Sequence, residues 1–140
     1  MKKRIILAMA FMSFVAAVSL SAFAQARGLT ADIPFNFTVK ERALPAGHYT
    51  IEAVRLAGSD ALRIISADGR ISATVLVRAE SRESGQEPRL VFNRYGDQYF
   101  LAEVFGFERR TAHQLARSKR EDHLAKLADR SRVTVEAKQR

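Results

Sequence analysis

The sequence predicts a mainly β protein, a small antiparallel sandwich or barrel of about six to eight strands built from hairpins, with one short C-terminal helix. Apolar residues alternate with polar ones from Leu29 to Val39, and Asp68-Gly69 and Gly96-Asp97 are tight-turn dipeptides. A helix-capping signature, S-x-x-E, begins at Ser118. Alternation is typical of a half-buried strand, and Gly beside Asp is typical of two-residue hairpin turns.

Two strands are predicted at the start of the β region. The first covers residues 29–39 and contains Pro34. Because proline has no N–H to donate to a neighbouring strand, this strand is expected to lie at a sheet edge or to carry a bulge. Leu44-Pro45-Ala46-Gly47 indicates a turn, and a second strand is predicted over residues 48–54.

The dipeptide Asp68-Gly69 predicts a hairpin with a type I′ turn, in which Ala67 pairs with Arg70. In this register one face is largely apolar, and the other is polar except for Ile65 and Leu76. The predicted core face consists of Leu62, Ile64, Ser66, Ile71, Ala73, Val75 and Val77. The hairpin is therefore expected to cover a core with one face and to meet water with the other.

The dipeptide Gly96-Asp97 predicts a second hairpin with a type II′ turn, in which Tyr95 pairs with Gln98. Both faces of this hairpin are apolar and aromatic. One consists of Leu90, Phe92, Arg94, Tyr99, Leu101 and Glu103, and the other of Val91, Asn93, Tyr95, Phe100, Ala102 and Val104. The favoured interpretation is that the C-terminal helix covers the second face, and the alternative is contact with a ligand or partner. The candidate contact residues are Asn93, Arg94, Tyr95, Tyr99 and Phe100.

The C-terminal segment, residues 109–140, has ten Lys and Arg residues against four Asp and Glu, whereas residues 27–108 have a net formal charge of −1. A helix is predicted near residues 118–129, with Leu124 and Leu127 on its buried stripe. Residues 109–117 are expected to form either a further strand or a loop, and residues 131–140 either a short last strand through Val133 and Val135 or a frayed end. The whole basic segment is expected to pack on the β body or to be partly mobile.

The first 26 residues predict a cleaved signal peptide. Lys2–Arg4 form a positive n-region, Ile5–Leu20 carry no charge, and Ala24-Gln25-Ala26 matches the small-x-small cleavage pattern, with a second frame ending at Ala24. The apolar run of 16 residues is shorter than the roughly 20 needed to span a bilayer. The mature chain, residues 27–140, is therefore expected to be periplasmic or extracellular, without a transmembrane segment.

No residue pattern predicts a catalytic, cofactor-binding or metal-binding site. The sequence has no cysteine, no G-x-S-x-G motif and no glycine-rich phosphate loop. His113 and His123 are ten residues apart, too far along one helix to share a metal ion, and His48 begins a predicted strand. Enzymes of the recognisable thiol, serine-hydrolase and nucleotide-binding types are excluded.

Four groups of motifs carry a resemblance to a known family. They are Ile33–Phe37, Leu44–Gly47 with Tyr49-Thr50, Leu90–Gly96 with Tyr99–Leu101, and Ser118–Glu121. Together they cover nearly the whole mature chain and resemble a family of small exported bacterial β-domain proteins of uncharacterised function. The resemblance implies a β-rich exported domain and implies no activity, cofactor or site residue.

These features predict a non-enzymatic structural or binding module of the cell envelope, and a small exported hydrolase or isomerase is the alternative. The favoured interpretation of the basic tail is a solvated helix without a specific partner. An anionic surface, such as phospholipid headgroups or envelope polysaccharide, comes second. Nucleic acid comes third, because the chain is expected to be exported and its tail does not interleave basic with aromatic residues. The candidate contacts with an anionic surface are Arg117, Lys119, Arg120 and Lys126.

The module is placed before the enzyme. A pocket that encloses two or more of four polar residues would reverse this order and place the enzyme first. Those residues are His48, Asn93, Arg94 and Glu103.

Overall fold

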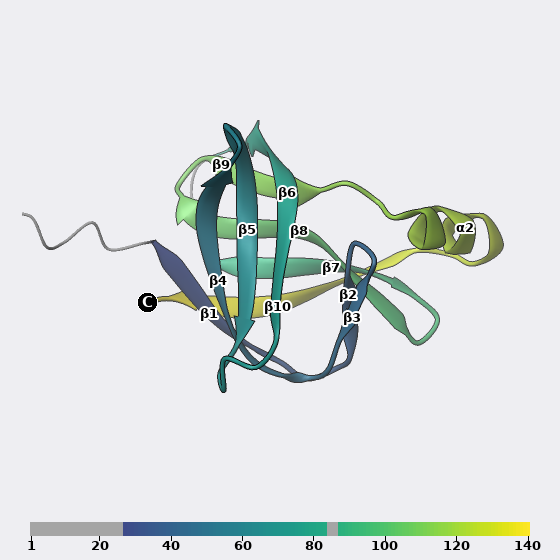
Figure 1. Ribbon diagram of the computed structural model, residues 1–140. Coiled ribbons are helices and arrows are strands. Elements are labelled where there is room, and N and C mark those ends of the chain that lie inside the picture. Colours follow the sequence, from purple (N-terminus) through teal and green to yellow (C-terminus); the bar gives the residue numbers. More distant parts are fainter. Residues whose placement is uncertain (1–26, 84–86) are drawn as a thin grey trace, which may run out of the picture.

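Eight antiparallel strands close into a barrel in the computed structural model, which describes residues 27–83 and 87–140 (Figure 1). In order of hydrogen-bonded neighbours the strands are β8 (Gln98–Glu108), β7 (Arg89–Tyr95), β10 (Ser131–Gln139), β1 (Gly28–Ile33), β4 (Gly47–Leu56), β5 (Ser59–Ser66), β6 (Ser72–Ser81) and β9 (Thr111–Leu115), which pairs with β8 again. Closure gives every barrel strand two neighbours and so limits exposed sheet edges. The predicted class, a small antiparallel barrel with one short C-terminal helix, is confirmed.

Three short elements lie outside the ring of strands. β2 (Phe37–Val39) and β3 (Arg42–Leu44) form a small hairpin, and β2 pairs in parallel with β8 through Thr38 and Phe100. Helix α2 (Lys119–Leu127) connects β9 to β10 and projects from one side of the barrel (Figure 1). The predicted signal peptide lies outside the described residues. Within those residues, no helix is long and apolar enough to cross a membrane.

The barrel interior is filled by inward-facing side chains from alternate strand positions, as expected for a barrel of this size. Its buried residues are Leu29, Ala31, Ile33, Phe37, Val39, Leu44, Tyr49, Ile51, Leu62, Ile64, Ala73, Val75, Leu90, Phe92, Leu101, Val104, Phe107 and Ala137. The rings of Phe37 and Tyr49 meet edge to face at 5.2 Å, and those of Phe37 and Phe92 at 5.5 Å. The core is therefore a packed interior whose buried members come from residues 29–107 and from Ala137, with Leu115, Val133 and Val135 packed against it.

The strand predicted over residues 29–39 is divided in two at Pro34. β1 ends at Ile33, and the chain then leaves the ring to form β2 beside β8. β1 is not an edge strand, because it pairs with both β4 and β10. The missing N–H of proline ends the strand, while the apolar alternation continues because both pieces face the same core.

The register predicted for the first hairpin is observed, but the type I′ turn is wrong. Ser66 N donates to Ile71 O at 2.9 Å, which continues the expected pairing. Gly69 has a positive φ of 71°, but Asp68 does not, and a type I′ turn needs positive φ at both central residues. Instead Gly69 N donates to Ser66 O, and Asp68 accepts hydrogen bonds from Ser66 Oγ and Arg70 N. The Asp68 side chain thus stabilises a longer turn of the same register.

A positive-φ pair occurs at a turn that sequence analysis missed. Leu56 pairs with Ser59 across Ala57-Gly58, and the φ angles of these two central residues are 49° and 82°. These angles are those of a type I′ turn. Alanine rarely adopts positive φ, so the composition of this turn gives no sequence signal.

The second hairpin has the predicted Tyr95–Gln98 pairing, but a bulge changes its faces further along. Phe92 pairs with Leu101, whereas Val91 pairs with Glu103, so Ala102 is an extra residue in β8. Because one inserted residue reverses the two faces, the predicted grouping of Glu103 with Leu101 is wrong. Glu103 points to the outside of the barrel.

The C-terminal segment is an integral part of the barrel, since β9 pairs with β6 and β8 and β10 pairs with β1 and β7. Helix α2 begins after Ser118, whose hydroxyl accepts a hydrogen bond from Glu121 N at 3.1 Å, as the S-x-x-E pattern predicts. Leu127, predicted on the buried stripe, is 71% exposed. Glu121 takes the buried position on α2 instead.

Candidate functional site

The five candidate contact residues of the second hairpin do not share one surface. Asn93, Tyr95 and Phe100 are buried. Arg94 and Tyr99 belong to a separate stack, in which the Tyr99 ring lies on Phe35 at 3.9 Å and the Arg94 guanidinium lies 5.5 Å from the Tyr99 ring centre. The hairpin therefore does not present these residues together to a ligand.

Glu121 of α2 binds the buried polar groups of this hairpin. Its Oε1 atom accepts one hydrogen bond from Asn93 Nδ2 at 2.8 Å and another from Tyr95 Oη at 3.2 Å. The residue is 4% exposed. Burial and the Glu121 charge raise the pKa of Tyr95, and Arg117 and Arg130 act in the opposite direction. The carboxylate thus joins the helix to the barrel wall.

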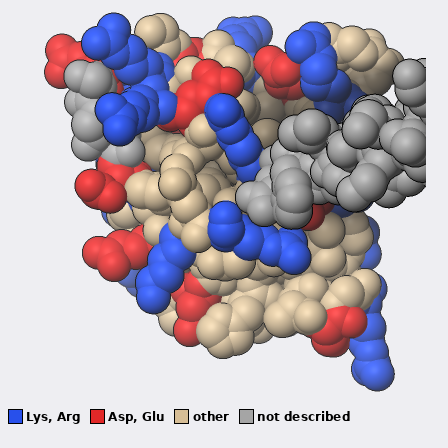
Figure 2. Space-filling view, turned by 90° about the vertical axis from the view of Figure 1, so that its left-hand side faces the viewer, with Lys and Arg blue, Asp and Glu red and all other residues tan. Residues whose placement is uncertain are grey.

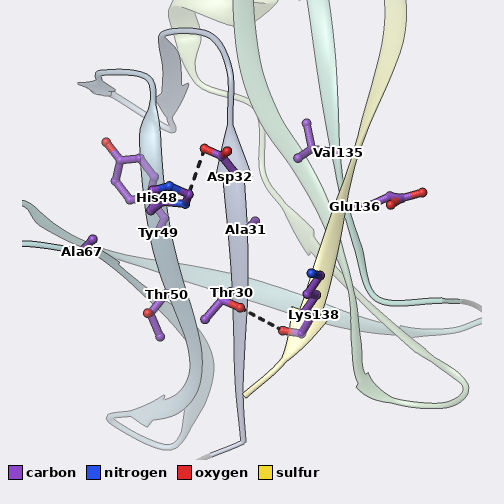
Figure 3. Close-up of a pocket in the computed structure, with 10 residues that line it drawn as sticks. All are labelled: Thr30, Ala31, Asp32, His48, Tyr49, Thr50, Ala67, Val135, Glu136 and Lys138. Atoms are coloured by element: carbon purple, nitrogen blue, oxygen red, sulfur yellow. Dashed lines mark hydrogen bonds and ion pairs between the residues drawn. The ribbon is translucent and has the colours of Figure 1, made fainter.

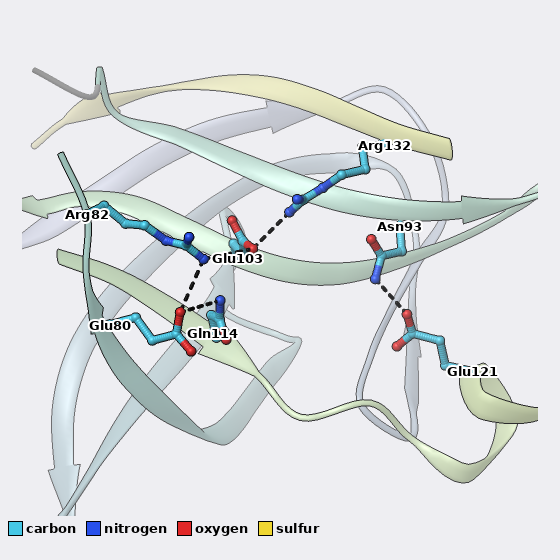
Figure 4. Close-up of polar contacts among 7 residues, drawn as sticks. All are labelled: Glu80, Arg82, Asn93, Glu103, Gln114, Glu121 and Arg132. Carbon is cyan, nitrogen blue, oxygen red and sulfur yellow. Dashed lines mark hydrogen bonds and ion pairs between the residues drawn. The ribbon is translucent and has the colours of Figure 1, made fainter. Parts of the chain in front are cut away.

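A row of ion pairs crosses the outer surface of the barrel beside this contact (Figure 4). Arg82 Nη2 lies 3.2 Å from Glu80 Oε2 and 3.7 Å from Glu103 Oε1, and Arg132 Nη2 lies 2.9 Å from the same Glu103 oxygen. Gln114 Nε2 donates to Glu80 Oε2 at 2.8 Å. The Glu103 side chain is only 13% exposed, and the two arginines at short range balance its charge.

A cleft of about 170 Å³, the α2 cleft, lies between the ion-pair row and Glu121. Its lining residues are Asn93, Ala102, Glu103, Gln114, Leu115, Arg117, Glu121, Arg130 and Arg132. The cleft encloses Asn93 and Glu103, two of the four polar residues, so it meets the condition that would place the enzyme first. Both side chains already have partners, however: Asn93 donates to Glu121, and Glu103 is paired with two arginines. The Asn93 amide does not ionise, and the two arginines stabilise the charged form of Glu103, so the pair does not form a general acid and base.

The larger groove, of about 740 Å³, lies where β1 and β10 separate (Figure 3). His48 Nδ1 is 3.6 Å from Asp32 Oδ1, and their side chains are 74% and 71% exposed. The two residues are directly opposite each other on β4 and β1. A solvated cross-strand pair of this kind stabilises the sheet slightly and lacks the dry surroundings that activate catalytic groups.

The four candidate cationic contacts occupy different positions around α2. Arg117 lines the α2 cleft, and Arg120 Nη2 donates to Gln98 Oε1 at 2.7 Å. Lys119 and Lys126 are exposed at the two ends of the helix. On the side of the molecule away from α2, basic and acidic side chains are interspersed (Figure 2). Residues 117–130 at the α2 end have five Lys and Arg against three Asp and Glu, one of which, Glu121, is buried.

His113 is a buried histidine on β9 that no sequence pattern marked as special. It is 7% exposed, its ring meets Phe107 edge to face at 5.3 Å, and its Nδ1 atom has no hydrogen-bond partner in the described part of the chain. Burial lowers the pKa of His113, and the nearby Glu108 and Asp60 offset this only in part. The folded barrel therefore holds the imidazole in its neutral form.

Acid should destabilise the barrel through His113. Because its pKa is lower in the folded state, the unfolded chain binds the proton first as pH falls below about 6.5. Stability is then lost until the pH reaches the folded-state value, at up to about 1.4 kcal/mol per pH unit. Urea unfolding between neutral and mildly acidic pH should show this slope in the wild type and in His123→Gln. A His113→Leu variant that kept the full slope would contradict the assignment.

No group of three or more His, Asp or Glu side chains arranged to hold a metal ion occurs in residues 27–83 and 87–140. Comparisons with family models, curated proteins and solved structures yield no match to this chain. The geometry of the α2 end is therefore the basis for assigning a function.

Proposed function

We propose that this protein is a non-enzymatic exported binding module that docks on the anionic lipid surface of a bacterial cell envelope through helix α2. The observation that carries the proposal is the orientation of α2. Its one buried residue, Glu121, is bonded to the barrel, so the opposite side of the helix faces outward.

The outward side of α2 carries two lysines and one exposed apolar side chain, and one acidic residue, Asp122, lies beside Lys126. At about 100° per residue, Lys119, His123 and Lys126 lie on one stripe opposite Glu121. Leu127, 71% exposed, lies beside that stripe. Lysines attract anionic headgroups, while a leucine at the same depth enters the boundary between headgroups and acyl chains. This combination favours a lipid surface over a polysaccharide, which offers no apolar layer.

Export is part of this proposal and rests on the sequence alone. The charged start at Lys2–Arg4, the uncharged run Ile5–Leu20 and the small residues up to Ala26 support a secretory signal. An exported chain meets the lipid and polymer surfaces of the envelope. Small exported domains often depend on disulfides, and this chain has no cysteine. Burial of apolar side chains must therefore stabilise it, and the packed barrel core supplies that burial.

The alternative, a small exported hydrolase or isomerase, is favoured by one observation, the α2 cleft that encloses Asn93 and Glu103. Its polar groups already bond to one another, as the Glu103–Arg132 and Asn93–Glu121 contacts illustrate. Such a cleft supports binding better than proton transfer. We therefore place the enzyme second.

Co-sedimentation with vesicles tests the docking proposal. The wild type is expected to bind vesicles that contain phosphatidylglycerol, to bind less as salt rises, and to leave pure phosphatidylcholine vesicles unbound. Lys119→Gln combined with Lys126→Gln should weaken binding by about 25-fold, or about fivefold per cation. Leu127→Ser should also weaken it, with little change in salt dependence.

The matched control for these vesicle measurements is Arg70→Gln combined with Arg78→Gln, which removes two exposed cations from the β5–β6 hairpin. This control should bind as the wild type does. Equal losses in the control and in the lysine variant would mean that net charge, rather than α2, governs binding. Binding of the lysine variant at wild-type strength would contradict the proposal.

A further inference from the structure

The α2 cleft retains unbalanced positive charge after its internal contacts are counted. Glu103 is paired with Arg82 and Arg132, and Glu121 accepts hydrogen bonds from two neutral groups. Two further arginines line the cleft, Arg117 and Arg130. Neither forms an ion pair with a residue of the described ranges. Even if both partly offset the buried Glu121 charge, one positive charge remains.

The two arginines reach the cleft from opposite ends of α2. Arg117 immediately precedes the N-cap residue Ser118, which is 2% exposed, and Arg130 immediately precedes β10. Both positions are therefore fixed by ordered neighbours: a buried cap on one side and a strand of the barrel on the other. A group bound between these two arginines would connect the two ends of the segment that contains α2.

The size and chemistry of the cleft match a small oxyanion. A volume of about 170 Å³ corresponds to about five or six water molecules at liquid density, too little for a sugar chain or a peptide. A guanidinium presents a planar fork of N–H donors that matches the oxygens of phosphate. Asn93, itself 5% exposed, adds a polar floor to the cleft.

We propose that the α2 cleft binds a single phosphate group between Arg117 and Arg130. The cleft lies on the Glu121 side of α2, whereas the lysine stripe that is proposed to meet lipid lies on the opposite side of the helix. The inference therefore does not rest on the docking function proposed above, and the ligand is taken to be the phosphate group of a soluble compound. The phosphate of a lipid headgroup would satisfy the same donors, and vesicles and soluble phosphate separate the two sources.

Titration of the purified protein with inorganic phosphate, followed by calorimetry or by amide chemical shifts, tests the cleft directly. The wild type is expected to show saturable binding, with the largest shifts at residues 117 and 130. Arg117→Gln and Arg130→Gln should each raise the dissociation constant about tenfold or more, because each removes a charge-assisted pair of hydrogen bonds. Arg70→Gln, which removes an exposed cation of the β5–β6 hairpin outside the cleft, should change it less than about twofold.

If a glutamine variant folds poorly, an arginine-to-lysine variant can test the same contact. Arg130→Lys retains the charge but not the planar fork, and it should bind phosphate more weakly than the wild type while unfolding at the same urea concentration. Absence of saturable phosphate binding by the wild type would overturn the inference. Equal phosphate affinities for Arg130→Gln and Arg70→Gln would overturn it as well.

The vesicle measurement separates this inference from the docking proposal. Protein that binds anionic vesicles but not soluble phosphate or glycerol phosphate would retain the docking function and lose the phosphate site. Protein that binds soluble phosphate but not vesicles would retain the site and lose the docking function. Binding to both, with both weakened by Arg130→Gln, identifies the headgroup phosphate as the ligand.

Discussion

Replacing Gly106 with alanine is expected to destabilise the barrel by about 3 kcal/mol. Gly106 has a φ of 118°, a conformation that residues with a side chain rarely adopt, and an added Cβ would lie 2.7 Å from Pro88 Cβ and 2.8 Å from Pro88 Cα. Because the second contact is with the backbone that leads into β7, rotation of a side chain cannot relieve it. Urea unfolding of the variant and the wild type measures the difference.

Gly106 is critical because of its place in the sheet. The β8–β9 pairing is irregular between Phe105 and Glu108, and within this irregular stretch Phe107 enters the core. Gln139 Nε2 donates to Gly106 O at 2.9 Å, which joins β8 to the end of β10. An added methyl group would therefore disturb a point where three strands meet.

The matched control for this first prediction is Gly69→Ala. Gly69 also has a positive φ, 71°, but an added Cβ would meet no atom within 4 Å. The control therefore carries the backbone strain alone, about 1 kcal/mol. Equal stability of the two alanine variants would show that the Pro88 contact is not the source of the cost.

Replacing Glu121 with alanine is expected to release α2 from the barrel and to lower stability by about 2 to 4 kcal/mol. The substitution leaves the Asn93 amide and the Tyr95 hydroxyl buried without an acceptor. An unsatisfied buried donor costs more than its hydrogen bond contributes, because it loses water without replacement. Urea unfolding and hydrogen exchange of the α2 amides measure the two effects.

Two variants bracket this second prediction. Glu121→Gln keeps an oxygen acceptor and should lose about half as much stability as Glu121→Ala. Asp122→Ala removes the exposed neighbouring carboxylate on the same helix and should change stability by less than about 0.5 kcal/mol. If hydrogen exchange of α2 in Glu121→Ala matched that in Asp122→Ala, the helix would not depend on the buried carboxylate.

The parts of the fold that follow from local rules could be predicted. The registers of both hairpins follow from their turns, because Ala67–Arg70 and Tyr95–Gln98 are the positions that a short turn brings together. The alternation from Leu29 marks the buried positions even though Pro34 divides the strand, since both pieces face one core. The capped start of α2 at Ser118 is likewise a local pattern.

The parts that depend on distant contacts could not be predicted. The bulge at Ala102 has no proline or glycine to signal it, yet it reverses the faces of β8 beyond that point. The alternation at Val133 and Val135 left residues 131–140 open between a strand and a frayed end, and only the pairing with β1 and β7 decides for a strand that completes the barrel. This strand has charged side chains on its outward face and apolar side chains on its inward face. The overall composition of residues 109–140 does not separate the two faces.

The candidate site illustrates the same limit. Asn93 and Tyr95 are polar groups on an apolar hairpin face, which suggested ligand contact, but the structure supplies their partner 28 and 26 residues away. The S-x-x-E pattern explains Glu121 as half of a local capping box, whereas its side chain bonds to β7. One sequence feature could have indicated this contact. Two polar donors, Asn93 and Tyr95, lie on an apolar hairpin face, and the helix predicted to cover that face contains an acidic residue, Glu121.

The central claim, that α2 is the surface that meets the lipid, is tested most directly by amide spectra of isotope-labelled protein mixed with nanodiscs of phosphatidylglycerol and phosphatidylcholine that carry a paramagnetic headgroup. Signals of Lys119, Lys126 and Leu127 are expected to broaden first, while those of the β4–β5 turn at Ala57-Gly58, which lies away from α2 (Figure 1), should stay sharp. Equal broadening at both places, or broadening confined to the β4–β5 turn, would contradict the account.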